Sequence, residues 1–226
     1  MLLNLDKQIS SAKILIADEF NQVVNTILEY ATSSIDIPIL KKLINKKFLK
    51  SRGKKLRLLL LLLIANAIKP ESKAIEQSYN KNYIKLSAAV ELIHIATLFH
   101  DDVLDHTFIR NNQKTINAEW GNQYAILAGD FLYSKALQLI LQINNAQIGT
   151  IITNATSSMT EGEILQLSQK YNFSISEETY FKIIINKTAQ LFATSFQTPA
   201  ILLFDNKNIH EGLRQCGLNF GIAYQI

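Results

Sequence analysis

The sequence contains very little of the residue types that cross-link a chain or interrupt its helices. It has one cysteine (Cys216), three prolines and eight glycines among 226 residues. A single cysteine excludes a disulfide within the chain, which is typical of proteins in a reducing cytosol. Few prolines and glycines, together with 48% hydrophobic residues, favour long helices over a sheet or a disordered chain.

The chain also has no strongly charged or lipid-like segment. Its formal net charge is only +4, and its densest basic group, Lys41 to Arg57, has no cluster of aromatic residues beside it, so we expect no nucleic-acid partner. Its first turns carry Asp6 and Lys7 where a secretory signal would be apolar. Leu58 to Ile68 is shorter than the roughly 20 residues that span a bilayer. We therefore expect a cytoplasmic protein with no stable membrane anchor and a buried helix at Leu58 to Ile68.

Periodic apolar positions predict an all-α fold, and because no stretch resembles an interdomain linker we expect a single domain over residues 1–226. Ser176, with Glu178 and Thr179 behind it, is a typical helix start, and Pro70 follows the end of another helix. The expected helices are Asn4 to Tyr30, Ile37 to Phe48, Lys54 to Ile68, Asn82 to Asp105, Ala118 to Leu141, Ala146 to Gln169, Ser176 to Gln197 and Lys207 to the end.

Three carboxylates, Asp101, Asp102 and Asp105, stand at the end of an otherwise apolar helical segment. At 3.6 residues per turn, Asp101 and Asp105 share one face, with His94 on the same line. Acidic groups near a helix C-terminus oppose the helix dipole and repel one another, so a cation is expected to stabilise them. Mg²⁺ fits because it takes oxygen ligands and is usually shared between carboxylates and substrate phosphates. The alternative is a solvated helix end, although the apolar residues before Asp101 favour a buried wall.

Two cations open the leucine-rich helix. Lys54 and Arg57 are three residues apart at a predicted helix N-terminus, where backbone N–H groups already favour an anion such as a diphosphate. An ordinary basic helix start is the alternative. Judged from residue type and position alone, His94 on its apolar helix would be a core histidine with its hydrogen bonds satisfied. Lys187 would be a surface lysine.

Several motifs in this order resemble the trans-type polyprenyl diphosphate synthases, and among them the bacterial long-chain, octaprenyl-type members. ELIHIATLFHDDVLD contains the DDxxD pattern of the family's first aspartate-rich motif, and an arginine, Arg110, follows it. NAEWGN, LAGDFLYSKA, EGEILQL, KTAQLF and GLNFGIAYQI continue the likeness, which covers the chain from about Gly53 onward. The resemblance implies an isoprenoid-synthase bundle of mostly antiparallel helices around a central cavity.

The resemblance also implies the reaction and its residues. Isopentenyl diphosphate would condense head-to-tail with an allylic diphosphate such as farnesyl diphosphate, giving a long-chain all-trans polyprenyl diphosphate for quinone side chains such as that of ubiquinone. The enzyme would be a Mg²⁺-dependent homodimer. Its catalytic residues would be Asp101, Asp102, Asp105, Arg110 and Lys187, the three aspartates being the metal ligands; Lys54, Arg57 and His94 would bind isopentenyl diphosphate, and Arg110, Lys187, Thr188 and Gln225 the allylic diphosphate.

Small residues beneath the aspartates bear on product length. Thr97 and Ala96 lie four and five residues before Asp101, about one turn deeper in the helix. In the family, bulky side chains near these positions block chain growth and small ones leave a tunnel, so the resemblance implies a long-chain product. The alternative is that Ala96 and Thr97 merely suit tight helix packing, and Phe99 would still obstruct part of the path.

The chain departs from the family pattern at three places. Arg52 and Leu58 replace a glycine and a proline of the basic motif. Asn111 replaces the second arginine of the family's Arg-Arg-Gly, and a neutral amide cannot reproduce a bidentate guanidinium contact. We therefore predict weaker binding of isopentenyl diphosphate.

The segment around Trp120, Gly121, Gly129 and Asp130 resembles the family's subunit-packing helix. We expect Trp120 to serve packing, the two glycines to allow close helix approach, and Asp130 to be a buried structural acid. Glu163 and Gln166 are three residues apart and would face the cavity or, alternatively, solvent.

No second DDxxD occurs in the sequence. The segment Phe220 to Ile226 resembles the one that leads into that second motif in the family, so we expect a C-terminally truncated family member. Three other classes stay open: a noncatalytic homologue or partner subunit of such a synthase, a terpene cyclase, and a plain helical scaffold. A cyclase needs no second substrate, so the isopentenyl-binding elements at Lys54, Arg57 and His94 argue against it.

Overall fold

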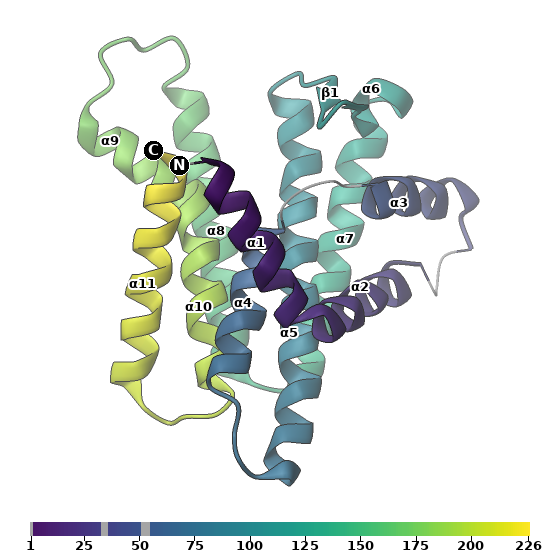
Figure 1. Ribbon diagram of the computed structural model, residues 1–226. Coiled ribbons are helices and arrows are strands. Elements are labelled where there is room, and N and C mark those ends of the chain that lie inside the picture. Colours follow the sequence, from purple (N-terminus) through teal and green to yellow (C-terminus); the bar gives the residue numbers. More distant parts are fainter. Residues whose placement is uncertain (1, 33–35, 51–54) are drawn as a thin grey trace. The chain divides into compact units, whose positions relative to one another are not determined.

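The computed structural model describes residues 2–32, 36–50 and 55–226, and within them the chain is almost entirely helical (Figure 1). This confirms the predicted all-α class. Lys54 and Arg52 lie outside the described residues. In chain order the elements are α1 (Leu2–Leu15), α2 (Ala17–Thr32), α3 (Pro38–Lys50), α4 (Leu56–Ala67), α5 (Lys73–Leu104), β1 (Ile109–Arg110), β2 (Gln113–Lys114), α6 (Ile116–Trp120), α7 (Asn122–Ile143), α8 (Ala146–Ser168), α9 (Glu177–Ile184), the π-helix η1 (Ile185–Ala189), α10 (Gln190–Ile201) and α11 (Lys207–Gln225).

A two-stranded hairpin follows α5, where the sequence predicted no strand. β1 and β2 pair antiparallel, with Ile109 opposite Lys114 and Arg110 opposite Gln113. The two residues between the strands, Asn111 and Asn112, have φ angles of 51° and 60°. Asparagine tolerates this left-handed region better than most residues and is preferred in two-residue hairpin turns that require it. The strands are too short for an alternating pattern to show in the sequence.

The helix boundaries differ from the prediction where the apolar pattern runs through a break. The first predicted helix is divided into α1 and α2 at the buried residue Ile16, and α5 already begins at Lys73. Gly121, with a φ of 98°, separates α6 from α7. The predicted helix start at Ser176 is confirmed, because its hydroxyl accepts a hydrogen bond from Thr179 N at 3.1 Å.

The described chain packs as two compact units. Unit 1 comprises Met1–Leu62 and Ile84–Ile143, and unit 2 comprises Leu63–Tyr83 and Asn144–Ile226. The core of unit 1 is made by apolar residues of α2, α4, α5 and α7. The first residues of the leucine-rich helix are buried in this core, which confirms the burial predicted for them. Core residues of unit 1 include Val23, Ile27, Leu58, Leu61, Leu62, Leu86, Leu92, Ile93, Leu132 and Leu139.

In unit 2, α10 and α11 lie side by side (Figure 1). Gly217 and Gly221 stand one turn apart on α11. A Cβ atom at Gly217 would lie 2.7 Å from Phe192 O, and one at Gly221 would lie 2.5 Å from Ala189 Cα. Only glycine permits this approach of the two backbones. The aromatic ring of Phe192 completes the contact, with its centroid 5.2 Å from that of Phe220.

Helix α7 is the one helix of the described residues that is long and apolar enough, by length and composition, to cross a membrane. Core helices of similar composition meet the same criterion, and α7 contributes Ala125, Ala128, Leu132 and Ala136 to the core.

Candidate active site

The three predicted carboxylates lie around the C-terminal end of α5 in unit 1. Asp101 is half-buried, Asp102 is buried and Asp105 is exposed. Asp105 N donates to Asp101 O at 2.8 Å, so these two residues are one helical turn apart, as their spacing predicted. Nε of Arg110, on strand β1, donates to Oδ1 of Asp102 at 2.8 Å. The hairpin therefore returns the predicted allylic-diphosphate arginine to the second aspartate.

The described residues contain no group of three or more histidine, cysteine, aspartate or glutamate side chains arranged to hold a metal ion. The carboxylates of Asp101 and Asp105 nevertheless fit Mg²⁺, which commonly uses one or two protein carboxylates and takes its remaining ligands from water and substrate phosphates. The carboxylate of Asp102 binds Arg110.

A basic cluster of Lys55, Arg57 and Arg110 lies near His94 in unit 1. Nη1 of Arg57, at the start of α4, is 3.3 Å from Nε2 of His94 on α5. One turn earlier on α5, the buried carboxylate of Glu91 accepts from Lys55 Nζ at 3.1 Å. The structure thus brings together two of the three predicted isopentenyl diphosphate ligands, Arg57 and His94. The third, Lys54, lies outside the described residues.

The imidazole of His94 is electrically neutral at pH 7 in this setting. Burial lowers its pKa well below the ordinary value, and the charges of Arg57, Lys55 and Arg110 lower it further. Because a guanidinium only donates hydrogen bonds, Nε2 of His94 accepts from Arg57 and the ring proton is on Nδ1. His94 is therefore neither a plain core residue nor a further cation of the cluster.

The predicted residues of the C-terminal part lie in unit 2. Lys187 and Thr188 are both on the π-helix η1. Nζ of Lys187 forms an ion pair with Oε2 of Glu163 on α8, and Oγ1 of Thr188 donates to Oε1 of Gln225 at 3.0 Å. A π-turn places one extra residue in a helical turn and is frequent at functional sites. Lys187 is thus a half-buried, paired lysine rather than a free surface one.

The position of η1 depends on a glycine of α8. A Cβ atom at Gly162 would lie 2.6 Å from Lys187 N and 2.9 Å from Asn186 Cβ. The backbones of α8 and η1 therefore touch directly beside the predicted allylic-diphosphate lysine. Glu163, the next residue, turns its carboxylate to the same lysine.

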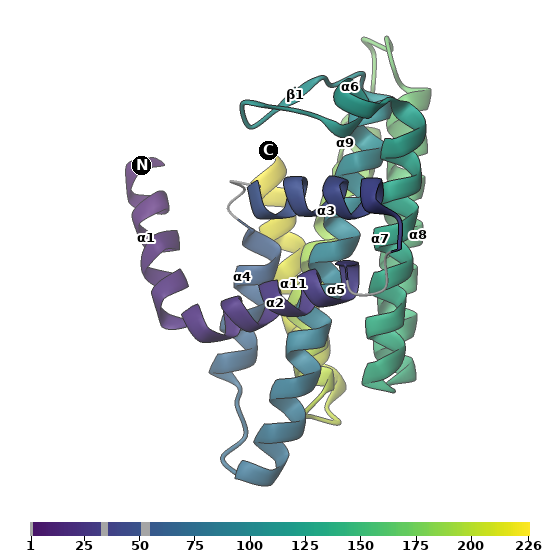
Figure 2. The same cartoon turned by 90° about the vertical axis from the view of Figure 1, so that its right-hand side faces the viewer.

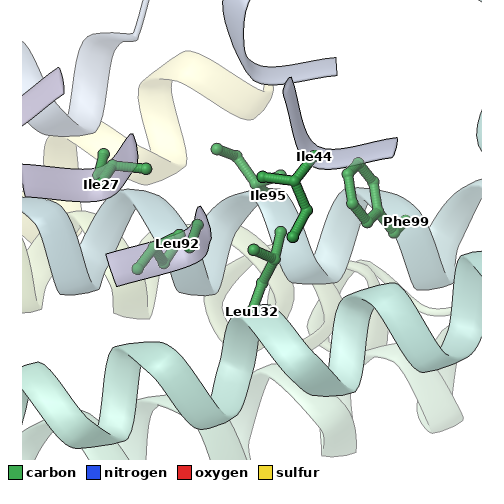
Figure 3. A pocket seen from close by; sticks show the side chains of 7 residues that line it. Ile27, Ile44, Leu92, Ile95, Phe99 and Leu132 are labelled. Carbon is green, nitrogen blue, oxygen red and sulfur yellow. The ribbon is translucent and has the colours of Figure 1, made fainter. Parts of the chain in front are cut away.

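An apolar pocket lies in unit 1 beside α5. Figure 3 shows Ile44, Ile95, Phe99 and Leu132 converging on it from α3, α5 and α7. Ala96 is buried, and Oγ1 of Thr97 donates to His94 O at 2.8 Å. Neither Ala96 nor Thr97 lines the pocket. Its full lining is Ile27, Ala31, Ile44, Leu92, Ile95, Phe99 and Leu132.

Gly129 has the predicted role in close packing, but Asp130 does not have the predicted burial. A Cβ atom at Gly129 would lie 2.4 Å from Nε2 of His100, so glycine leaves room for this imidazole. The side chain of Asp130 is 61% exposed, with Oδ1 at 3.2 Å from the same Nε2. The prediction of a buried acid was wrong because the apolar residues around Asp130 mark the other face of α7.

Two partners of the predicted residues were missed by sequence reasoning. Asn117, the first residue of NAEWGN, is buried and donates its amide to the main chain at the end of α5. Glu91 is the second, and its ion pair with Lys55 was not predicted. A buried asparagine or glutamate is not distinguishable from an exposed one by residue type, and only the apolar neighbours of each gave a signal.

A sequence model of the family described as polyprenyl synthetase matches residues 38–226. The octaprenyl diphosphate synthase of Escherichia coli is 34% identical over 174 residues, which cover 77% of this chain and 51% of that protein. Its counterpart in Haemophilus influenzae is 34% identical over 211 residues, covering 93% and 61%. The chain thus spans between half and about three fifths of these relatives.

Solved structures agree with the sequence comparisons. A polyprenyl synthase from Caulobacter crescentus, complexed with calcium and isoprenyl diphosphate, superposes with a TM-score of 0.87 at 31% identity. The superposition covers 96% of this chain and 63% of that one.

Proposed function

Because this chain belongs to the polyprenyl synthetase family, we propose that the whole protein condenses isopentenyl diphosphate head-to-tail with an allylic diphosphate such as farnesyl diphosphate. The product is a long-chain all-trans polyprenyl diphosphate, whose polyprenyl group becomes the side chain of a quinone such as ubiquinone when the diphosphate leaves. The observation that carries this proposal is the basic cluster at His94, within unit 1, which also bears the aspartates. A site of this kind offers positive charge to a diphosphate and carboxylates to its cation.

Lys55 and Arg57 of the basic cluster, together with His94, bind isopentenyl diphosphate in this proposal. Lys55 and Arg57 lie at the N-terminal end of α4, where the helix dipole adds to their attraction for an anion. Neutral His94 accepts a hydrogen bond from Nη1 of Arg57 and so holds the guanidinium in place. Lys54, which precedes Lys55 in the sequence, adds a further cation. These residues fix the diphosphate, so the homoallylic double bond of isopentenyl diphosphate is held facing the allylic carbon. The imidazole of His94 needs no positive charge for this.

The allylic diphosphate is bound by Arg110 and Lys187, with Thr188 and Gln225 as hydrogen-bonding partners. Guanidinium and ammonium groups stabilise the negative charge that develops as the diphosphate leaves the allylic carbon. The isopentenyl double bond then attacks that carbon, and loss of a proton to the released diphosphate restores an allylic product. The apolar side chains around α5 exclude water from the carbocation, which would otherwise be hydrolysed.

We propose Mg²⁺ as the cation at Asp101 and Asp105, with Asp102 assisting through its hold on Arg110. When bound, the ion neutralises the leaving diphosphate. The calcium in the Caulobacter crescentus synthase supports a site for a hard divalent ion that takes oxygen ligands.

We assign product length to Ala96 and Thr97, as their small size predicts. Phe99, which lines the apolar pocket (Figure 3), would obstruct part of the path. Growth of a chain past the small pair and beside Phe99 gives a long product.

We further propose that the protein is a cytoplasmic homodimer that pairs through α7. Tyr124, Leu127 and Phe131 follow the three-and-four spacing of a helix-packing stripe, and Leu141 lies ten residues further along the same face. Of these, Leu127 is 66% exposed and Leu141 is 77% exposed. Neighbouring exposed apolar side chains of this kind are typical of a protein–protein contact surface. A second copy of α7 is the natural cover for this stripe.

The test is an incubation of the whole protein with Mg²⁺, farnesyl diphosphate and labelled isopentenyl diphosphate, followed by analysis of product length. Asp101→Ala should abolish incorporation, while Asp205→Ala, which changes an exposed acid of unit 2, should leave it intact. Incorporation that survives Asp101→Ala, or a folded wild-type protein that makes no prenyl product, would refute the proposed reaction.

A further inference from the structure

The last main-chain carbonyl groups of α5 have no hydrogen-bond donor within the helix. An α-helix leaves its last carbonyl oxygens without intrahelical hydrogen bonds, and buried ones need other donors. Asp102 O is such a group, and Asp102 itself is only 5% exposed. Its carbonyl accepts from Thr107 N at 2.9 Å, which closes the turn between α5 and the hairpin.

A buried asparagine supplies the remaining donors. Nδ2 of Asn117 donates to Asp102 O at 2.9 Å and to Thr107 O at 3.1 Å. Both acceptors are carbonyl oxygens, so the amide nitrogen and not its oxygen must face them. The two N–H bonds of one side chain thus join the end of α5 to the base of the hairpin. Asn117 is the second residue of α6. Figure 2 shows α6 and the hairpin together at this end of α5.

Thr115 strengthens the same junction. It occupies the position before α6 where threonine normally caps a helix, yet its side chain makes no capping bond. Its Oγ1 donates instead to Thr107 O at 2.8 Å, and its main-chain N donates to Phe108 O at 3.0 Å. Thr107 O therefore accepts from both Thr115 and Asn117.

The asparagine is not the choice that stability alone would favour. Its Oδ1 is buried and has no hydrogen-bond partner among the described residues, and an unsatisfied buried polar atom lowers stability. The two N–H donors are therefore the property of Asn117 that this junction uses.

We infer that Asn117, supported by Thr115, is a positioning residue that fixes Asp102 and Arg110 relative to each other. Asn117 holds Asp102 by its main chain, and Arg110 binds its carboxylate at 2.8 Å. The hairpin that carries Arg110 is held by Thr115 and Asn117 at its base. The inference rests on the proposed function in one respect, because that function gives Asp102 and Arg110 to the diphosphate and its cation.

The matched variants are Asn117→Asp and Thr115→Val, with Asn122→Asp as the control. Aspartate has the shape of asparagine, but its ionised carboxylate cannot donate to either carbonyl, and valine has the shape of threonine without its hydroxyl. Asn122 is exposed at the start of α7 and receives the same change of charge as Asn117. Thr115→Val keeps the amide of Asn117, so it remains informative if Asn117→Asp fails to fold.

Two measurements are made on the whole protein. Hydrogen exchange of the metal-free protein should show faster exchange across residues 105–115 in both test variants and no change in the control. Steady-state kinetics should show a fall in kcat of roughly 10- to 100-fold for Asn117→Asp and a higher Mg²⁺ concentration for half-maximal rate. The KM for isopentenyl diphosphate should change little, because Arg57 and His94 do not contact the junction.

The outcomes separate the two proposals. Unchanged exchange at residues 105–115 would overturn the positioning role, and so would exchange that accelerates equally throughout the protein with kcat and KM impaired alike. If the wild-type protein makes no prenyl product, the proposed function fails. The positioning role is then decided by exchange together with calorimetric binding of Mg²⁺ and inorganic diphosphate, which Asn117→Asp should weaken.

Discussion

Replacing Gly162 by alanine tests the contact between α8 and the π-helix that carries Lys187. An alanine Cβ would lie 2.6 Å from Lys187 N, and main-chain atoms cannot turn aside as a flexible side chain can. Overpacking of this kind typically costs about 1–3 kcal/mol. Against it, alanine gains about 1 kcal/mol over glycine in a helix interior. The net change in the free energy of unfolding is therefore a loss of about 0–2 kcal/mol.

The chain offers a matched control for the helix-propensity term. Gly212 lies within α11, and a Cβ atom there meets nothing within 4 Å. Gly212→Ala should therefore stabilise the protein by about 0.5–1 kcal/mol. The difference between the two variants, about 1–3 kcal/mol, reports the contact alone. In thermal unfolding each kcal/mol corresponds to a shift in Tm of about 2–4 °C for a protein of this size.

The assay is thermal and urea unfolding of both variants beside the wild type, followed by steady-state kinetics. Gly162→Ala should also raise the KM for the allylic diphosphate, because the displaced segment carries Lys187 and Thr188. Equal stabilisation by Gly162→Ala and Gly212→Ala would refute the close approach of the two backbones. A lower Tm with an unchanged KM would refute its link to the allylic site.

Two further predictions concern unit 1. His94 has a pKa below its ordinary value of 6.5. Below pH 6.5 its imidazole is therefore protonated in the unfolded chain and stays neutral in the folded chain. The free energy of unfolding should then fall by up to about 1.4 kcal/mol per pH unit, and His94→Asn should flatten this slope in urea titrations from about pH 7.5 to 5.5; parallel profiles would contradict the buried neutral imidazole. Asn111→Arg should lower the KM for isopentenyl diphosphate in steady-state assays, although arginine at a left-handed position costs about 1–2 kcal/mol, and an unchanged KM would place Asn111 outside that site.

The fold class and the geometry around the aspartates were predictable because both depend on periodicity. A spacing of four residues fixes that Asp101 and Asp105 are one turn apart, whatever surrounds them. Motif order then brought Arg57 and His94 into one proposed site, and the structure places them 3.3 Å apart. Burial of the leucine-rich helix followed from its composition alone.

Other features depend on contacts between residues far apart in sequence. Nothing in the pattern of α8 indicates that Gly162 touches Lys187, or that Lys55 pairs with Glu91 across 36 positions. The hairpin is too short for alternation to reveal it, and the acidic character of Asp130 does not show which side of α7 it faces. The predicted roles of the individual site residues, and the single domain, stay predictions.

The π-helix also has a consequence for how the chain tolerates insertions and deletions. The π-helix η1 contains one residue more than an α-helical turn would. The α-helices α9 and α10 continue directly on either side of it. Removing one residue between Ile185 and Ala189 would restore an unbroken α-helix but rotate one side against the other by about 100°. Either Lys187 would turn from Glu163 or Phe192 would leave the contact with α11. Gaps in this stretch should therefore be absent from alignments of functional homologues.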